Sequence, residues 1–233
     1  MQVSSFLKKT ISTVRPYIVI LFTISVLKTV LFEFFLVPTG SMIPTIHPGD
    51  FILTTKYNYG YSKYSFWPLS LPVIKTKLLE RKPNYGDIVI IKRDDKEPKR
   101  LVKRVIGLPG DEIKIINDSL MINDYVVEKN SKLFKNYYNA IEAEECLPNK
   151  KKHLILLVDK ESNKVMFTSV FNVPQDHYFL MGDNRNNSDD SRFNLGYVHS
   201  NHLIARAQYV LIPSNNSINP FNWNKKRFFS KLI

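Results

Sequence analysis

The sequence predicts a mainly β protein, in which an antiparallel β-sheet domain (residues 38–233) follows a single N-terminal transmembrane helix. Three observations predict this fold. One apolar run has the length of a membrane span, the rest of the chain contains many short runs rich in β-branched and aromatic residues, and no long amphipathic helix separates those runs. Because parallel strands need crossover connections, which are usually helices, their absence favours antiparallel pairing.

The apolar run extends over 21 residues, from Tyr17 to Val37, close to the roughly 20 that an α-helix needs to cross hydrocarbon. We interpret residues 16–37 as a transmembrane anchor with a juxtamembrane segment. Lys28 and Glu33 are costly at the bilayer centre, so we expect them near the outer interface and the spanning part to end between Leu27 and Phe32. A cleaved signal peptide is the alternative, but the run is long and no small-x-small cleavage site follows it.

Basic residues beside this run predict its orientation. Lys8, Lys9 and Arg15 favour a cytoplasmic location for residues 1–15, which places the β-rich domain outside. Residues 1–37 carry four basic side chains and one acidic one, so +9 of the formal net charge of +12 belongs to the outer domain. No basic nucleic-acid-binding motif accompanies this charge, so we expect membrane phospholipids rather than nucleic acid as its partner.

Beyond the anchor, short β-rich runs alternate with turn signals such as Pro48-Gly49 and Pro109-Gly110. Two stretches are expected to be loops or insertions: residues 57–82, which are rich in aromatic residues and proline, and residues 129–152, which are polar. Cys146 is the only cysteine, so no intrachain disulfide can form. The predicted strands cover residues 51–55, 87–92, 101–106, 112–116, 120–122, 154–157, 164–168, 178–181 and 204–212.

A serine and a lysine are the candidate catalytic residues. Ser41 lies in the segment PTGSMIPT, beside a glycine that lets a substrate backbone approach closely. A serine hydroxyl is a poor nucleophile until a base removes its proton. Strand alternation places Lys103 on one face with Leu101 and Val105, where burial would lower its pKa from about 10.4 toward the operating pH of a general base.

Four ordered segments then carry a resemblance to a known family. They are PTGSMIPT at 38–45, GDFIL at 49–53, KRVIGLPGD at 103–111 and GDNRNNSDDSR at 182–192. Together, and downstream of the apolar run, they resemble the bacterial type I signal peptidases (leader peptidases). The resemblance implies a membrane-bound serine endopeptidase with a serine–lysine dyad and no cofactor. It would cleave signal peptides from exported preproteins after small residues (Ala-x-Ala), at the outer or periplasmic side of the bacterial cytoplasmic (inner) membrane.

The resemblance also implies roles for individual residues. Ser41 matches the family nucleophile and Lys103 its neutral general base. Thr39 matches the position whose hydroxyl joins the backbone N–H of Ser41 in the oxyanion hole. Ser188 matches the serine that hydrogen-bonds to the catalytic lysine and orients it.

Two further groups of residues are implied in the same way. Asp190 and Arg192 match a buried ion pair that supports the dyad, and Asp183 and Arg185 are expected as its companions. Shallow apolar pockets for the small substrate residues are implied around Phe35, Val37, Met42, Ile46, Ile52 and Val102.

The sequence also departs from the family pattern. Arg100 stands where the best-known relatives carry an acidic residue, and it could alter the rim of the substrate pocket. His199 stands where proline is usual. The stretch between Asp111 and Gly182 is short, so we expect residues 112–180 to form a reduced, variable second lobe.

Three alternatives remain at this stage. A membrane-tethered serine–histidine hydrolase could use one of the five histidines, of which His47 is nearest to Ser41 in sequence. A non-catalytic β-domain could bind peptides or lipids through its basic surface. Self-cleaving repressors also pair serine with lysine, but the membrane-length run argues against them. No metal-ligand spacing or phosphate-binding glycine loop is visible. The five histidines are His47, His153, His177, His199 and His202.

Overall fold

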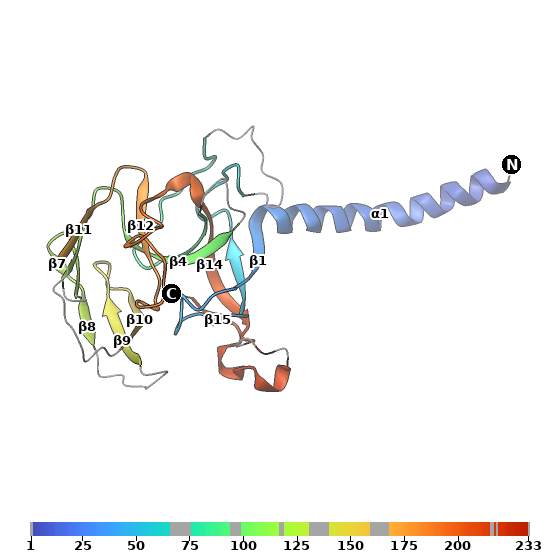
Figure 1. The fold of residues 1–233 in the computed structure, drawn as a ribbon. Helices are drawn as coiled ribbons and strands as arrows, with labels where there is room; N and C mark the ends of the chain where they lie inside the picture. The colour runs from blue at the N-terminus through green and yellow to red at the C-terminus, as the bar shows by residue number, and fades with distance from the viewer. Residues whose placement is uncertain are drawn as a thin grey trace.

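A long helix leads into a domain made of antiparallel sheets in this computed structural model (Figure 1), which confirms the predicted mainly β fold class. The structure describes residues 2–65, 76–93, 99–116, 119–130, 140–158, 168–214, 217 and 219–232. The predicted loop over residues 57–82 and the predicted strand over 164–168 lie partly outside these residues.

Helix α1 (Gln2–Leu31) projects away from the β domain, with the N-terminus at its far end (Figure 1). Its segment Ser12–Leu31, 20 residues long, is long and apolar enough to cross a membrane, and none of it is buried against the domain. The helix ends inside the range predicted for the end of the span. The backbone N–H of Lys56 donates to the carbonyl of Leu31 at 3.0 Å, and its Nζ donates to that of Thr29 at 3.2 Å. These bonds satisfy carbonyls that a helix C-terminus leaves without partners.

The last part of the predicted apolar run is not helical. Phe32–Leu36 form strand β1, which pairs with β2 (Phe51–Thr55) from Phe32 opposite Thr55 to Leu36 opposite Phe51. Alternation explains the change: Phe35 faces the core, whereas Phe34 and Leu36 stay exposed. The last residues of the apolar run, which were expected to follow the spanning part, therefore form a strand, because aromatic residues with period-two alternation suit a half-buried strand.

The described residues of the domain form three sheets. Strands β1, β2, β14, β3, β4, β12 and β13 lie side by side in that order in the large sheet, where β15 also pairs with β14. Two smaller sheets have the orders β10-β9-β8 and β11-β5-β6-β7. The remaining strands are β3 (Ile88–Lys92), β4 (Arg100–Gly107), β5 (Glu112–Ile116), β6 (Ser119–Ile122), β7 (Tyr125–Val126), β8 (Glu128–Asn130), β9 (Ala140–Cys146), β10 (Lys152–Val158), β11 (Thr168–Asn172), β12 (His177–Met181), β13 (Val198–His199), β14 (Leu203–Ile212) and β15 (Ser230–Lys231). Three short 3₁₀ helices are η1 (Ser200–His202), η2 (Pro220–Asn222) and η3 (Lys225–Arg227).

Most predicted strands match this set within one or two residues, but the loop predicted over 129–152 is wrong. Within it, β8 and β9 form a sheet with β10. The polar composition of β9 misled the prediction because its strand has one buried and one partly exposed face: Ala143 and Glu145 are buried, whereas Glu142 and Glu144 are not.

Strands β3 and β4 run through the centre of the domain and are buried on both faces. Ile88, Ile90 and Val102 belong to a cluster with β1, β2 and β14, whereas Val89 and Val105 belong to a second cluster with β12 and β13. A polar side chain on β4 therefore lies in a largely dry environment, which strengthens electrostatic effects on it.

Candidate active site

Lys103 lies in the middle of β4, where the neighbouring strand ends. β12 pairs with β4 as far as the position opposite Arg104, so Gly182 leaves the sheet beside Lys103. Segment 182–192 then returns to the lysine: Nζ of Lys103 donates to Oγ of Ser188 at 3.0 Å. Lys103 is only 2% exposed. The structure thus brings together the predicted base and the serine predicted to orient it.

The environment of Lys103 lowers its pKa. Burial, which disfavours the ammonium form, moves the pKa from 10.5 to about 8, although the carboxylates of Asp190, Asp189 and Asp183 act in the opposite direction. At the ordinary pKa, roughly one lysine in a thousand is neutral near pH 7.5, whereas a pKa of about 8 leaves roughly a quarter neutral. Such an amine can accept a proton near neutral pH.

Ser41 lies in the turn that connects β1 to β2. The turn is closed by hydrogen bonds between Val37 and the Gly49-Asp50 pair, at 2.8 and 3.0 Å. Ser41 is 8% exposed, and its Oγ lies 3.5 Å from Oγ1 of Thr39. The hydroxyl groups of Ser41, the predicted nucleophile, and Thr39, the predicted oxyanion-hole donor, therefore lie next to each other.

Gly182 packs against both the Ser41 turn and Ser188, the serine that contacts Lys103. A Cβ atom added at Gly182 would lie 2.3 Å from Oγ of Ser188 and 2.5 Å from the carbonyl oxygen of Ser41. Both groups therefore pack on the same side of Gly182, and no larger residue fits there. Asn184 fastens the contact, because its backbone N–H donates to the Ser41 carbonyl at 3.0 Å and its Nδ2 donates to that of Gly40 at 3.1 Å.

The predicted Asp190–Arg192 ion pair is present. Nε and Nη2 of Arg192 donate to the two carboxylate oxygens of Asp190 at 2.9 and 2.8 Å. Asp190 also accepts from the backbone N–H of Gly182 at 2.9 Å and from the hydroxyl of Ser188. Burial raises the pKa of Asp190, but Arg192 and these hydrogen bonds outweigh it and lower the pKa below its ordinary value. A fixed carboxylate therefore orients Ser188, which in turn contacts Lys103.

Asp183 and Arg185, the expected companions, do not pair with each other. Asp183 pairs with Arg104, whose Nε and Nη2 both donate at 2.8 Å, and it accepts from Oγ1 of Thr45 at 2.5 Å. Arg185 pairs with Glu145 of β9. No role was assigned to Arg104 or Thr45 from the sequence, although both lie in the four family-like segments. Glu145 was also missed, because an acidic stretch does not indicate that one of its carboxylates is buried against an arginine.

The turn that carries Ser41 is also held from the C-terminal end of the chain. Nη2 of Arg227 donates to the carbonyl of Thr45 at 3.0 Å and to Oδ2 of Asp50 at 2.7 Å. Ser214 donates to the carbonyl of Gly49 at 2.5 Å. Contacts between residues about 180 positions apart have no local sequence signal, so these could not be predicted.

All six residues predicted to line the substrate pockets belong to one hydrophobic cluster beside the Ser41 turn. Met42, Ile46 and Ile52 are fully enclosed, whereas Phe35 and Val102 keep 7% and 6% of their surface exposed. The enclosed members can form only the floor of a pocket, and Phe35 and Val102 are the ones that a substrate could touch.

Among the strands that the structure describes, β1 pairs only with β2 and therefore lies at the edge of the sheet. Its Glu33 pairs with Lys56 at 3.3 Å and with Arg100 of β4, and the Arg100 guanidinium lies 5.2 Å from the centre of the Phe35 ring. Arg100, noted for its departure from the family pattern, therefore contacts Phe35, one of the residues predicted to line the substrate pocket.

The histidines do not form a catalytic arrangement with Ser41 in the hydrogen bonds of the described residues. The rings of His177 and His202 contact the carbonyls of Gln175 and Lys92. His153 lies 3.4 Å from Glu145. These contacts favour the lysine over a serine–histidine pair.

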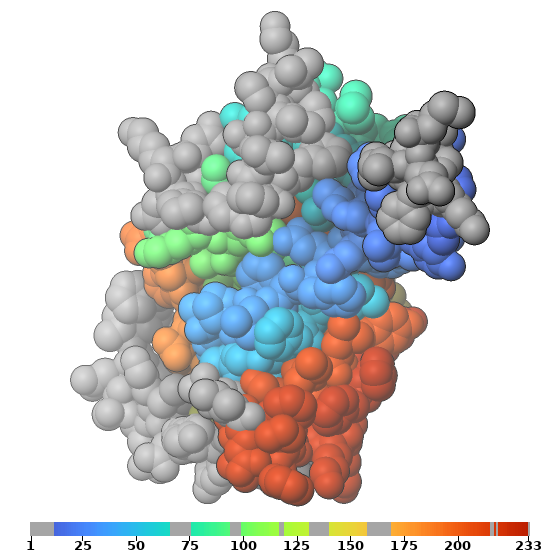
Figure 2. All heavy atoms as spheres, turned by 90° about the vertical axis from the view of Figure 1, so that its right-hand side faces the viewer, coloured from blue at the N-terminus to red at the C-terminus, as the bar shows by residue number. Residues whose placement is uncertain are grey.

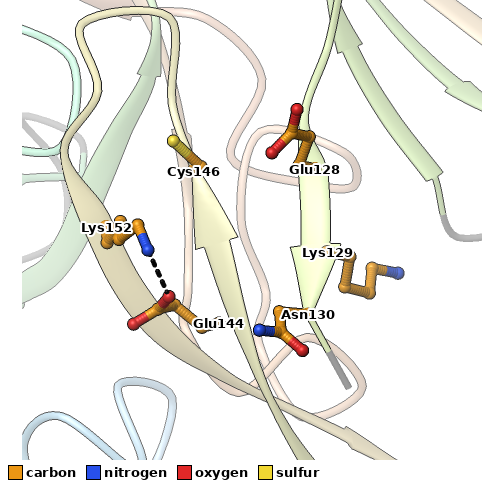
Figure 3. A pocket seen from close by; sticks show the side chains of 6 residues that line it. All are labelled: Glu128, Lys129, Asn130, Glu144, Cys146 and Lys152. Atoms are coloured by element: carbon orange, nitrogen blue, oxygen red, sulfur yellow. Dashed lines mark hydrogen bonds and ion pairs between the residues drawn. The ribbon is translucent and has the colours of Figure 1, made fainter. Parts of the chain in front are cut away.

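A surface pocket of about 370 Å³ lies elsewhere, on the small sheet β8-β9-β10 (Figure 3). Lys152 and Glu144 form an ion pair within it at 3.0 Å. Within the part of the chain that the structure describes, no group of three or more His, Cys, Asp or Glu side chains could hold a metal ion. The pocket is lined by Glu128, Lys129, Asn130, Glu144, Cys146 and Lys152.

Comparison with known proteins agrees with this geometry. The family described as signal peptidase, peptidase S26, matches residues 9–212. Signal peptidase I of Rickettsia typhi (strain Wilmington) is 39% identical over 199 residues, which cover 79% of this chain and 74% of the relative. Signal peptidase I of Rickettsia conorii (strain Malish 7) is 38% identical over 198 residues, with coverage of 79% and 73%.

A solved structure was also matched. The crystal structure of a signal peptidase I from Enterococcus faecalis V583 has a TM-score of 0.34 and 25% identity, and the match covers 54% of this chain and 97% of that chain. The family match spans most of the chain, and the Rickettsia relatives align over more than two thirds of both sequences. The chain therefore belongs to the signal peptidase family, peptidase S26.

Proposed function

We propose that this chain is a membrane-bound serine endopeptidase that removes signal peptides from exported preproteins, with Ser41 as nucleophile and Lys103 as general base. Family membership supports signal-peptide cleavage by a serine peptidase. The observation that carries the assignment to these two residues is the buried amine of Lys103, which has a pKa of about 8 and contacts Ser188 at the glycine that also contacts Ser41.

The proposed reaction follows from these positions. The neutral amine of Lys103 takes the proton of the Ser41 hydroxyl as Oγ attacks the scissile carbonyl carbon. The negative oxygen that forms is stabilised by the backbone N–H of Ser41 and the hydroxyl of Thr39. The Lys103 ammonium then protonates the leaving amine, which gives an acyl-enzyme. Lys103 then takes a proton from a water molecule as the water attacks the ester carbon. The Lys103 ammonium returns that proton to Oγ of Ser41 as the ester bond breaks, and the signal peptide leaves with a new C-terminal carboxylate.

Specificity for small residues is proposed to come from the shallow surface around Phe35 and Val102. Because the residues beneath are fully enclosed, a side chain larger than alanine has little room. The free edge of β1 can form main-chain hydrogen bonds with an extended substrate, whose alternate side chains then meet the pocket. This arrangement favours an Ala-x-Ala cleavage site.

Helix α1 is proposed to cross the cytoplasmic (inner) membrane once, with residues 1–15 on the cytoplasmic side and residues 38–233 on the extracytoplasmic side. The length and exposure of Ser12–Leu31 support a span, and the basic residues of the leader support the orientation. Since β1 follows the helix directly, the Ser41 turn would lie close to the membrane surface.

Membrane phospholipids are the second proposed partner. Figure 2 faces the side from which α1 projects and shows β1, β2 and the C-terminal segment next to one another. The C-terminal segment carries Lys225, Lys226 and Lys231, and positive charge of this kind favours anionic headgroups. Apolar side chains of these elements are exposed, namely Phe34, Leu36, Phe51, Tyr209, Phe221 and Phe229.

We expect the double variant Phe221→Ser/Phe229→Ser to lose most of this lipid contact. The two phenylalanine side chains are 87% and 69% exposed, and burial of each in lipid would contribute about 2 kcal/mol to membrane binding. The measurement is quenching of Trp223 fluorescence by brominated lipid in vesicles that contain the full chain, in a Trp67→Phe background. Val126→Ser on β7 is the matched control, and equal quenching in all three proteins would contradict the proposal.

We expect the rate constant kcat/KM to rise with pH and to level off above about pH 8, because only the neutral amine of Lys103 can act as base. The measurement is a pH profile of preprotein cleavage between pH 6 and 10. A rising limb near pH 6.5 that disappears when a histidine is replaced would instead identify a serine–histidine enzyme.

The test of the function itself is cleavage of a preprotein with an Ala-x-Ala site by the full chain in lipid or detergent. Mass spectrometry of the mature N-terminus should place the cut directly after the second alanine. A preprotein with phenylalanine at either alanine position is the control, and it should remain uncut.

A further inference from the structure

We infer that Glu145, on strand β9 of the small sheet, is a positioning residue for catalysis: it holds Arg185 and, through Arg185, the segment that carries Gly182 and Ser188. This inference rests on the proposed function. It gives the small sheet a role in the reaction, although the sequence marks this part of the chain only as a variable lobe.

The first step is the pairing of Glu145 with Arg185. Nη1 of Arg185 donates to Oε1 of Glu145 at 2.7 Å, and Nη2 donates to Oε2. Glu145 has no exposed surface, and Arg185 is 7% exposed. Burial raises the pKa of Glu145, but the charge of Arg185 and the contact with His153 together outweigh it and bring the pKa to about 2, so the carboxylate stays ionised.

The second step runs from Arg185 to the reacting groups. Nε of Arg185 donates to the carbonyl of Gly182 at 3.2 Å, and its own carbonyl accepts from Nη2 of Arg192 at 2.7 Å. Arg185 therefore contacts both the glycine on which Ser41 and Ser188 pack and the arginine that holds Asp190. A shift of Arg185 would therefore displace both Gly182 and Arg192, which lie at the two ends of segment 182–192.

The third step explains why Glu145 lies under this segment. The backbone of β10 forms hydrogen bonds with segment 182–192: the N–H of Leu156 donates to the carbonyl of Asp183 at 2.8 Å, and its carbonyl accepts from the N–H of Arg185 at 3.0 Å. β9 is the neighbour of β10, with Glu145 directly opposite His153. Burial and the charge of Arg104 lower the pKa of His153, so His153 is neutral and Arg185 is the cation that Glu145 serves.

The consequence is a defined geometric role. A buried guanidinium without its carboxylate is costly, so loss of the Glu145 charge would release Arg185 from Gly182. A general base must stay within hydrogen-bond reach of its proton, and a displacement of about 1 Å can cost about a hundredfold in rate. Among the described residues, Glu145 forms no hydrogen bond or ion pair with Ser41 or Lys103, so its proposed effect on the reacting groups runs through Arg185.

The experiment compares Glu145→Gln with Glu144→Gln in the full-length protein. Glu144 is the adjacent residue on the same strand, but it is partly exposed and pairs with Lys152 on the opposite face (Figure 3). We expect Glu145→Gln to lower kcat about a hundredfold with KM changed less than about threefold, and to shift the pH at which the rate rises. Glu144→Gln should match the wild type.

Two outcomes would overturn the inference. One is a Glu145→Gln protein with wild-type kcat and pH profile, while the wild type cleaves the preprotein normally. If Glu145→Gln does not fold, Arg185→Lys keeps the buried charge pair but removes the two-point bond and the contact to Gly182. An Arg185→Lys protein with wild-type kcat is the second outcome. A wild type that fails to cleave would refute the proposed function instead.

Discussion

Replacement of Lys103 by methionine is expected to abolish preprotein processing while the domain stays folded. Loss of a general base costs about 10²- to 10⁴-fold in rate, and Lys103 is the proposed base, whose amine contacts Ser188 beside the Ser41 turn. Ser41→Ala removes the nucleophile and should cost on the order of 10⁶-fold. Cleavage assays with excess enzyme measure the rate loss of both variants. Lys114→Met, a partly exposed lysine on β5, is the control.

Stability provides a second and independent reading of Lys103. Its pKa is lower in the folded than in the unfolded protein, so burying the ammonium destabilises the fold by about 3 kcal/mol at pH values below about 8. The cost fades as pH rises from about 8 toward 10.5, because both states then lose the proton. Lys103→Met removes this cost. We therefore expect the variant to be more stable than the wild type at pH 7, with the difference shrinking toward pH 10.5.

Denaturant unfolding at several pH values measures this difference in the free energy of unfolding. Groups that titrate in the same way in both proteins do not contribute to the difference. A Lys103→Met protein that is inactive and also unfolded would remove the evidence for a chemical role. Retained cleavage by a folded Lys103→Met protein would refute the dyad outright and return the non-catalytic binding domain to consideration.

The sequence predicted the parts of this site that lie in local patterns. Alternation along β4 marked Lys103 as a buried lysine, because Leu101 and Val105 flank it at the spacing of one strand face. The resemblance of the segment GDNRNNSDDSR to the family implied the Asp190–Arg192 pair, whose two side chains are also close neighbours in the chain. Where geometry follows from two or three adjacent residues, a sequence is sufficient.

Contacts across the chain could not be predicted in this way. Arg104 is the residue after Lys103 and points to the other face of the strand, yet its partner Asp183 is 79 positions away. Glu145 stands in a run of four acidic or small residues that looked like a solvated loop, and only the pairing of β9 with β10 reveals its buried face. Similarly, the pairing of β1 with β2 directly after α1 joins residues that a hydropathy pattern does not connect.

The second large effect is expected at Arg104. Arg104→Met should lower the free energy of unfolding by about 3 to 5 kcal/mol, because it leaves the carboxylate of Asp183 buried without its cation. Both side chains are 1% exposed, and Arg104 also donates to the carbonyl of Gly86 at 2.8 Å. Breaking the Lys152–Glu144 pair with Lys152→Met is the matched control. The side chains of that pair are 61% and 29% exposed, so its loss should lower the free energy of unfolding far less than loss of the Arg104–Asp183 pair.

The pH dependence identifies the cause of this loss. Arg104 holds the pKa of Asp183 below its ordinary value of 3.8 despite burial, so the stability from the pair is present at neutral pH and is lost as pH falls below that value. Without Arg104, burial raises the pKa of Asp183 instead. The gap in stability between wild type and Arg104→Met should therefore be widest near pH 7 and should narrow on acidification; a gap independent of pH would indicate lost packing alone.

Adding Asp183→Asn to Arg104→Met completes the argument. The double variant has no buried charge at this position, so it should regain part of the stability that the single variant loses, whereas independent effects would simply add. Its activity should not recover to the same extent. Asp183 accepts from Thr45 on the Ser41 turn at 2.5 Å, and Arg104 is what fixes that carboxylate in place. Recovery of stability without recovery of cleavage would separate the cost of a buried charge from the positioning of the nucleophile.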